Sequence, residues 1–305
     1  MLSEIKSMPF MAQNFLENAD RYSLPLHVPY IGMGSSFFAP LAFKYMGIDI
    51  YPEMASEYYN YLSHGKKFPS GVLISQSGRS TEVLWCAELF NNFTAISNNT
   101  DSPLCKFPNV ESIILLQAGE EQFSSSKTYI NTLLALFKGF GVDVTNSIML
   151  LSRKMDQYEQ QGIELANKVF TLIQNNQLNG LYITGSGPNI GTAMQASLIL
   201  SESTKLNFNG MSMAQYDHGP KEAARDSVII NIMSKGKSYE RTKKLEETLS
   251  AAGAIVLTVE EPAATENESI IHNIIPFNFM AYYLSNKLNI QDTFTVGRKV
   301  TEVTL

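Results

Sequence analysis

The chain has 305 residues, of which 44% are hydrophobic and 17% charged, so it can bury a large core and is not expected to be disordered. The net charge of −6 argues against nucleic acid as the main partner, because surfaces that bind nucleic acid are basic. No apolar run approaches the roughly 20 residues that a membrane span needs, and residues 1–10 do not resemble a signal peptide. The two cysteines, Cys86 and Cys105, lack the spacing of a metal or redox site. We therefore expect a soluble, cytoplasmic protein with no metal and no other cofactor.

In the N-terminal half, short apolar runs alternate with patterns of helical spacing. Residues 1–19 are predicted to form a helix that packs outside the first sheet. Strands are predicted over residues 28–32, 71–75, 94–97 and 112–116, and helices over residues 81–90 and 127–140.

The C-terminal half repeats this plan after a charged helix over residues 151–174. Strands are predicted over residues 180–184, 228–232, 254–259 and 269–276, and helices over residues 191–202, 239–252 and 277–287. Strands that alternate with helices indicate parallel sheets covered on both faces. The predicted fold is therefore α/β, with two doubly wound parallel-sheet lobes in tandem. Its expected parts are an N-terminal helix (1–20), a first domain (21–150), a second domain (151–288) and a C-terminal tail (289–305).

Ligand binding is predicted at residues 75–81, which read Ser-Gln-Ser-Gly-Arg-Ser-Thr between an apolar strand and a helix. Four hydroxyl groups and one amide gather there, and hydroxyl and backbone N–H groups at such a turn can hold a phosphate. The alternative is ordinary helix capping by Ser77 or Ser80. Capping needs one such residue, so the pattern favours a phosphate site.

One glycine-rich turn follows the first strand of each lobe. It spans residues 32–36 in the first lobe and residues 185–187 in the second. Glycine lets the backbone bend sharply and approach a ligand. Neither turn has the Gly-x-Gly-x-x-Gly pattern of a dinucleotide site. Simple turn formation explains them as well as anion binding does.

Three ionisable residues are candidates for proton transfer. Glu202 lies near the end of a helix that is otherwise apolar or small, His218 lies in a turn before Pro220, and Lys299 lies in a basic pair of the tail. A carboxylate beside a carbonyl can act as a base, and a histidine can move a proton near neutral pH. From position alone, all three are more typical of solvated residues.

Taken together, the motifs resemble those of the sugar isomerase (SIS) domain family, over nearly the whole chain. The likeness is strongest to the isomerase half of glucosamine-6-phosphate synthase and to stand-alone glucosamine-6-phosphate deaminases. The segments that carry it are 34–36, 75–78, 118–121 with 126–127, 185–220 and 297–302.

The resemblance implies a role for each candidate residue. The phosphate and neighbouring hydroxyls of a sugar would be held by Ser35, Ser36, Ser75, Gln76, Ser77 and Ser80, with Ser125 lining the same pocket. Glu202 would move the proton between C1 and C2. His218 would assist ring opening in the active site of a neighbouring subunit, and Lys299 would contact the open-chain sugar near C2. A homodimer with shared active sites is implied.

The chain departs from the synthase pattern in three respects. Residue 199 is Ile where the synthase has a lysine, no cysteine lies near position 1, and no glutaminase domain precedes the lobes. In the second lobe, residues 234–238 have lost the serine pattern. We therefore expect one phosphate pocket per chain and no use of glutamine.

The function expected from these residues is conversion of glucosamine 6-phosphate to fructose 6-phosphate and ammonia. The enzymatic alternatives are another aldose–ketose phosphate isomerase and a deglycase for an amine-linked sugar phosphate. A sugar-phosphate sensor without catalysis is the alternative from a different class. The only expected partners are the sugar phosphate and a second copy of the chain.

Overall fold

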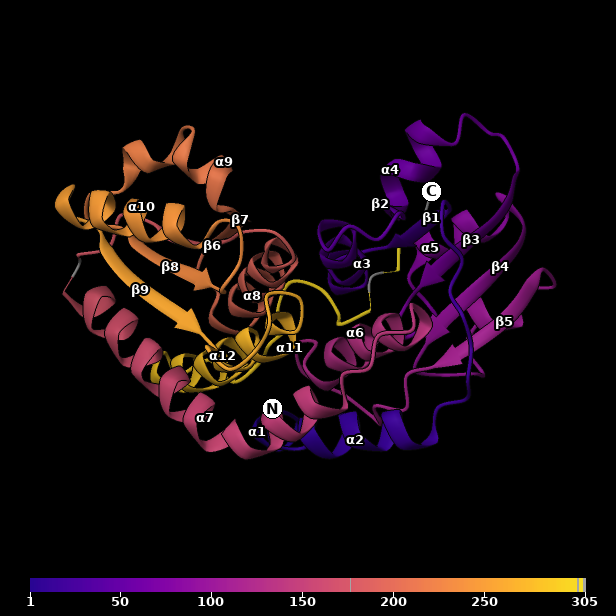
Figure 1. The fold of residues 1–305 in the computed structure, drawn as a ribbon, viewed down its shortest axis with the longest axis horizontal. Helices are drawn as coiled ribbons and strands as arrows, with labels where there is room; N and C mark the ends of the chain where they lie inside the picture. The colour runs from indigo at the N-terminus through magenta and orange to yellow at the C-terminus, as the bar shows by residue number, and fades with distance from the viewer. Residues whose placement is uncertain (176, 301, 304–305) are drawn as a thin grey trace. The chain divides into compact units, whose positions relative to one another are not determined.

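The computed structural model describes residues 1–175, 177–300 and 302–303. They form two compact units (Figure 1). The first unit comprises Ser7–Ile148 and Thr295–Leu305, and the second unit comprises Met1–Lys6 and Met149–Phe294. The C-terminal segment thus belongs to the same unit as the first sheet, and the first six residues belong to the same unit as the second sheet.

The first unit is built on a five-stranded parallel sheet with the order β2-β1-β3-β4-β5. This is the strand order of flavodoxin-like doubly wound sheets. Its strands are β1 (Pro29–Gly32), β2 (Tyr51–Met54), β3 (Phe68–Ile74), β4 (Phe90–Ser97) and β5 (Val110–Leu115). Its helices are α2 (Met8–Asn18), α3 (Ser35–Tyr45), α4 (Ala55–Glu57), the π-helix η1 (Tyr58–Leu62), α5 (Thr81–Ala87), the 3-10 helix η2 (Leu104–Lys106) and α6 (Lys127–Gly139).

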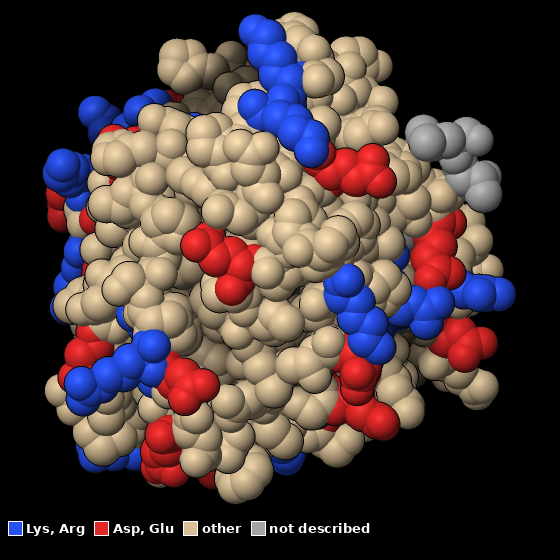
Figure 2. Space-filling view, turned by 90° about the vertical axis from the view of Figure 1, so that its right-hand side faces the viewer, with Lys and Arg blue, Asp and Glu red and all other residues tan. Residues whose placement is uncertain are grey.

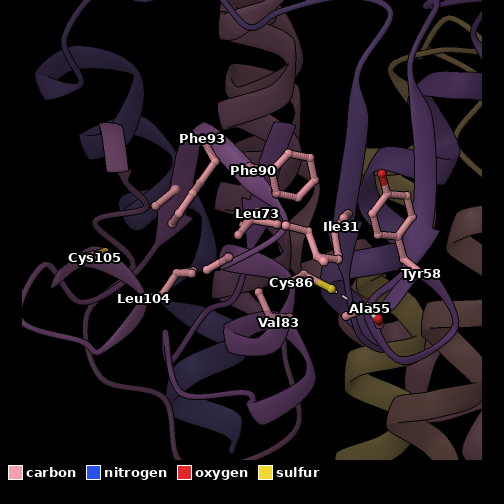
Figure 3. Packing of buried hydrophobic residues seen from close by; sticks show 13 residues of the cluster. Ile31, Ala55, Tyr58, Leu73, Val83, Cys86, Phe90, Phe93, Leu104 and Cys105 are labelled. Carbon is pink, nitrogen blue, oxygen red and sulfur yellow. Dashed lines mark hydrogen bonds between the residues drawn. The ribbon is translucent and has the colours of Figure 1, made fainter. Parts of the chain in front are cut away.

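The central strands β1 and β3 are buried on both faces of the sheet, since neighbouring residues of a strand point to opposite sides and consecutive residues of both strands are buried. On one side, Ile31 and Leu73 pack with Val83 of α5 and with Cys86 (Figure 3). On the other side, the ring of Tyr30 lies 6.0 Å from that of Phe140, which follows α6. Strands covered in this way are apolar almost throughout, and this is why β3 could be predicted from sequence.

Cys86 is a core residue of the first unit. Its thiol donates a hydrogen bond to the carbonyl of Ala55 at 3.3 Å (Figure 3). Burial raises the pKa of the Cys86 thiol to about 12. The group therefore stays protonated at neutral pH and is not a nucleophile.

The second unit has a four-stranded parallel sheet with the order β7-β6-β8-β9. Its strands are β6 (Leu181–Gly185), β7 (Phe208–Ser212), β8 (Val228–Met233) and β9 (Ile255–Glu260). Its helices are α1 (Leu2–Lys6), α7 (Thr145–Gln174, which begins in the first unit), α8 (Asn189–Thr204), α9 (Met213–Asp217), the 3-10 helix η3 (Pro220–Ala223), α10 (Tyr239–Ala251), α11 (Ser269–Asn273) and α12 (Ile275–Lys287). The order matches that of the first sheet with its last strand missing.

Three predicted elements differ from the structure. The strand predicted over residues 269–276 is wrong, because this segment forms α11 and the start of α12. All of α11 is buried, so its apolar run carried no periodic signal to separate helix from strand. The single helix predicted over residues 1–19 is two helices, since Pro9 lacks an N–H group and is tolerated only in the first turn of α2. Helix α5 ends at Ala87, and Phe90 instead begins β4 and pairs with Phe68.

Within the described residues, no helix is both long enough and apolar enough to cross a bilayer. Figure 2 shows one face of the molecule, on which acidic and basic side chains are interspersed among uncharged ones. The described residues on this face form no large area of purely positive or purely negative charge.

Candidate functional site

The serine loop, defined here as residues 75–81, connects β3 to α5 at the carboxyl end of the first sheet. Gly78 turns the chain with a φ of +63°, and a Cβ there would overlap the side chain of Ser102. The amide of Gly78 donates to the Ser75 carbonyl at 3.0 Å, and the Gly78 carbonyl accepts from the Leu104 amide at 3.0 Å. The loop is therefore a fixed turn that requires glycine at this position.

The hydroxyl groups of the loop do not cap helix α5. Ser80 stands at the N-cap position, but its side chain makes no capping hydrogen bond. Its oxygen instead accepts from the Ser75 hydroxyl at 3.1 Å. Ser77 Oγ accepts from the Arg79 amide at 3.2 Å. The capping alternative therefore does not account for these side chains.

A cavity of about 590 Å³ opens beside the loop, entirely within the first unit. It is lined by Gln76, Ser77 and Arg79 of the loop, by Asn98 and Asn99 after β4, by residues 119–122 and by Val300 of the tail. The strands are parallel, so the segments that follow β3, β4 and β5 meet at one edge of the sheet. A cavity of this kind at this edge is the usual place for a small polar ligand.

Asn98 fixes one wall of the cavity. Its Nδ2 donates to the Gly119 carbonyl at 2.7 Å, and its Oδ1 accepts from the Ala118 amide at 2.9 Å. This pair of bonds holds the segment after β5 in register with the end of β4. Asn98 thus fixes the position of residues 118 and 119 relative to the end of β4.

The tail contacts two other walls. Lys299 Nζ donates to the Glu121 carbonyl at 2.7 Å, to Glu121 Oε2 at 3.1 Å and to the Phe123 carbonyl at 2.6 Å. Glu302 pairs with Arg79 of the serine loop at 2.6 Å. Contact between Lys299 and a bound sugar would require its ammonium group to release or share one of these bonds.

The other predicted binding residues of the first unit lie at starts of helices. Ser35 and Ser36 open α3, half-buried, and the Ser36 amide donates to the Met33 carbonyl at 3.1 Å. A Cβ on Gly32 would meet the Ser36 backbone within 2.6 Å, so glycine there lets α3 approach β1. Ser125 lies before α6, with its hydroxyl 2.8 Å from that of Thr128. All three serines follow strands at the same edge of the sheet as the serine loop.

Glu202 and His218 belong to the second unit. Glu202 is half-buried near the end of α8, and its carbonyl accepts from Lys205 Nζ at 2.7 Å. His218 caps α9 and is exposed, with its amide bonded to the Ala214 carbonyl at 3.1 Å. Ile199, where the synthase pattern has a lysine, is fully buried. Residue 199 is therefore a core position in this chain.

The second unit has a loop at the place of the serine loop, residues 234–238. A Cβ on Gly236 would overlap the carboxylate of Glu266, which also lies 3.5 Å from the Cβ position of Gly187. An acidic side chain of the chain itself thus borders both glycine turns of this sheet. A carboxylate in that place disfavours a second anion.

No group of three His, Cys, Asp or Glu side chains within the described parts of the chain has the geometry to hold a metal ion.

Several residues that line the cavity are not predicted by the sequence pattern. The sequence pattern assigns no role to Arg79, Asn98 or Asn99, all of which line the cavity. The sequence does indicate a binding position for Asn98 and Asn99, because these polar residues directly follow the apolar strand at residues 94–97.

No model of a known protein family matches the chain. The chain is 24% identical over 288 residues to a glutamine–fructose-6-phosphate aminotransferase (isomerizing) of Pyrococcus horikoshii. It is 25% identical over 291 residues to the protein of the same name in Thermotoga maritima. These alignments cover 83% and 85% of this chain but 48% and 46% of the relatives. The chain therefore spans about half the length of the curated relatives it matches.

Solved structures share the fold over nearly the whole chain. A glucosamine-6-phosphate deaminase from Thermotoga maritima superposes with a TM-score of 0.79 at 20% identity, over 98% of each chain. The C-terminal domain of a glucosamine-fructose-6-phosphate aminotransferase from Francisella tularensis gives 0.76 at 16% identity, over 95% of this chain and 96% of that one. A tagatose-6-phosphate ketose/aldose isomerase from Escherichia coli gives 0.67 at 14% identity, over 96% and 95%. All are named as enzymes or parts of enzymes, in agreement with the prediction of an enzyme. The predicted resemblance of this chain to the sugar isomerase (SIS) family is thus confirmed by its relatives in sequence and its neighbours in fold.

Proposed function

We propose that the protein is an enzyme that binds a phosphorylated sugar in the cavity beside the serine loop. The observation that carries this proposal is the cavity itself, in which polar groups from three strand ends and from the tail converge. The relatives and fold neighbours, which are named for fructose 6-phosphate, glucosamine 6-phosphate and tagatose 6-phosphate, support the choice of ligand.

The phosphate end of the ligand is assigned to the serine loop. Hydroxyl groups of Ser75, Ser77 and Ser80 are clustered, and those of Ser75 and Ser80 are in contact. Gln76 and Ser77 line the cavity directly. A phosphate offers acceptors to such donors, and hydrogen bonds to an ionised acceptor are about twice as strong as neutral ones. Ser35, Ser36 and Ser125 would contact the rest of the sugar.

The reaction that we propose is the isomerising deamination of glucosamine 6-phosphate. His218 would assist ring opening, which exposes an aldehyde at C1. Glu202 would then take the proton from C2 and return it to C1, which leaves an imine at C2. Hydrolysis of the imine consumes one water and gives fructose 6-phosphate and ammonia. Both residues have the proton chemistry that these steps need.

The departure at residue 199 supports this choice over amino-transfer synthesis. Ile199 is fully buried and offers no amine, whereas the synthase pattern has a lysine at that place. With isoleucine at this position, three residues before Glu202, the side chain can neither carry a charge nor transfer a proton near the proposed base. Deamination or plain isomerisation needs only the carboxylate and the histidine.

We further propose that the enzyme is a cytoplasmic homodimer with shared active sites. Both cysteines are free and buried, which suits a reducing compartment. His218 is exposed, so it is available to a second subunit.

The test of the proposed function is the release of ammonia and fructose 6-phosphate from glucosamine 6-phosphate by the purified protein. The Glu202→Gln variant should lose turnover and keep binding of the sugar phosphate, because it changes the proton acceptor but hardly its size. Glu164→Gln, on the exposed part of α7, is the matched control and should behave as wild type. Formation of ketose phosphate without ammonia, from any aldose phosphate in a substrate panel, would favour a plain isomerase instead.

One observation favours a second candidate, a sugar-phosphate sensor without catalysis. All three donors of Lys299 point to oxygen atoms of the protein rather than to the cavity. Such a lysine can hold the tail without taking part in chemistry. Tight binding of a sugar phosphate with no turnover of any sugar in the panel would support the sensor.

A further inference from the structure

Arg79 is a part of the serine loop that the proposed function leaves unused. Of the described residues that line the cavity beside this loop, only Arg79 is basic, and Glu120 and Glu121 are acidic. The Arg79 amide is tied to Ser77 Oγ, so the backbone that carries the guanidinium is fixed in the loop. Helix α5 has only seven residues, so few aligned peptide dipoles add to the charge at its start. Among the described residues that line the cavity, Arg79 is therefore the one that can place a full positive charge against a bound dianion.

The guanidinium of Arg79 is held by a carboxylate of the tail. Its Nε and Nη2 donate to Glu302 Oε1 at 3.0 and 2.6 Å. The side chains are 56% and 44% exposed, so the pair is of the kind that contributes little net stability and exchanges readily. A phosphate carries more charge than a carboxylate and accepts two parallel bonds from a guanidinium.

Glu302 reaches this place because the tail is anchored on either side of it. Lys299 is bound to Glu121 and Phe123, Val300 lines the cavity, and the Val303 amide donates to Thr81 Oγ1 at 3.0 Å. The carboxylate is thus held against Arg79 in an adjoining cavity, which Arg79 and Asn99 line together with Glu302. A ligand phosphate and Glu302 would meet at the same guanidinium.

We propose that Arg79 is a further residue of the phosphate site, and that Glu302 is an internal competitor for it. The ligand class is a phosphomonoester; that it is a sugar phosphate rests on the proposed function. When the ligand binds, its phosphate takes the donors that Glu302 holds, and Glu302 is released. The charge at Glu302 therefore sets the affinity of the site without any contact to the sugar.

The experiment is calorimetric titration with fructose 6-phosphate and with inorganic phosphate, at constant ionic strength. Glu302→Gln should bind both ligands about two- to fivefold tighter than wild type, because a surface pair of this kind contributes a fraction of a kcal/mol to about 1 kcal/mol. Arg79→Gln should bind both about tenfold or more weaker. The double variant should match Arg79→Gln, because Glu302 acts only through Arg79. Glu88→Gln, at the other end of α5, removes the same charge from an exposed site and should behave as wild type.

Equal or weaker binding by Glu302→Gln, or unchanged binding by Arg79→Gln, would overturn the inference. This result is distinct from failure of the proposed function. If wild type binds inorganic phosphate with the predicted pattern but neither binds nor converts a sugar phosphate, the proposed function fails and the competition stands. If wild type binds and converts the sugar phosphate but Glu302→Gln has wild-type affinity, the competition fails and the function stands.

Discussion

The ammonium group of Lys299 lies 3.1 Å from Glu121 Oε2, and Glu121 in turn holds the start of helix α6. Glu121 Oε1 accepts from the Ser126 amide and from the Ser126 hydroxyl, both at 2.9 Å. Its Oε2 also accepts from Thr128 Oγ1 at 2.5 Å. One fully buried carboxylate thus joins the tail to the first turn of a core helix.

We predict that Glu121→Gln destabilises the protein. Gln offers one oxygen in place of two, so the donors at the start of α6 that bind the other oxygen lose a partner, whereas Lys299 keeps the backbone carbonyls of residues 121 and 123. A buried donor left without a partner costs about 1–3 kcal/mol, and more if it is charged. We expect the free energy of unfolding to fall by about 2–4 kcal/mol in urea titration.

The neighbouring Glu120→Gln is the matched control for this change. Glu120 is exposed, so the same substitution should alter the free energy of unfolding by less than about 0.5 kcal/mol. If both variants were equally stable, Glu121 would not be the link that the geometry indicates.

A second buried polar cluster lies in the second unit. The Tyr158 hydroxyl donates to Glu261 Oε2 at 2.8 Å and lies 3.0 Å from His272 Nδ1. His272 is fully buried, and burial lowers its pKa to about 4; Glu261 and Glu268 partly oppose this shift, and Lys154 adds to it. The fold therefore holds this histidine neutral.

This burial predicts a loss of stability on acidification. The unfolded histidine takes up a proton near pH 6.5, whereas the folded one does so only near pH 4. Between these values the unfolded state binds more protons, so stability falls as the pH is lowered through this window and levels off below it. The full difference corresponds to about 3 kcal/mol.

The measurement is urea unfolding at several pH values from 7.5 to 4. His272→Gln should have a shallower dependence on pH than wild type, whatever its stability at pH 7.5. His64→Gln removes an exposed histidine and should keep the wild-type slope. A variant at 272 with an unchanged slope would show that the acid sensitivity comes from other groups.

The central strands could be predicted from sequence because burial on both faces makes them apolar throughout. β8, for example, was predicted as residues 228–232 and is Val228–Met233, every residue of it buried. The edge strands β2 and β7 could not be predicted. β2 contains Pro52 and exposes two of its four residues, as suits an edge strand, and so lacks the apolar signal.

The serine loop could be predicted from its composition, because hydroxyl residues gather there within seven positions. The partners of the tail could not, since the pairs Arg79–Glu302 and Glu121–Lys299 join residues 223 and 178 positions apart. No local pattern encodes such a pairing. The buried position of His272 in a helix could not be predicted either, because residues 269–276 have the apolar composition of a strand.

The Ser77→Ala variant should separate ligand binding from folding. Ser77 Oγ lines the cavity and makes one bond to the Arg79 amide, in an exposed part of the loop. We expect affinity for fructose 6-phosphate to fall about tenfold, since a hydrogen bond to a charged group contributes about 1.5–3 kcal/mol. The free energy of unfolding should change by less than about 1 kcal/mol. Ser56→Ala, on a different surface, is the control, and equal affinity in the two variants would remove Ser77 from the site.

A last prediction concerns the proposed sharing of active sites. If each site takes Glu202 from one subunit and His218 from the other, a dimer of Glu202→Gln with His218→Ala contains one site with both changes and one intact site. Each variant alone should be inactive. Random reassociation of equal amounts makes half of the dimers mixed, so activity should return to about a quarter of the wild-type value, as a twofold-symmetric dimer requires. Mixed dimers isolated with two different affinity tags should reach about half. Isolation of mixed dimers with both tags establishes that subunits have exchanged, and inactive mixed dimers would then place Glu202 and His218 of one chain in the same site.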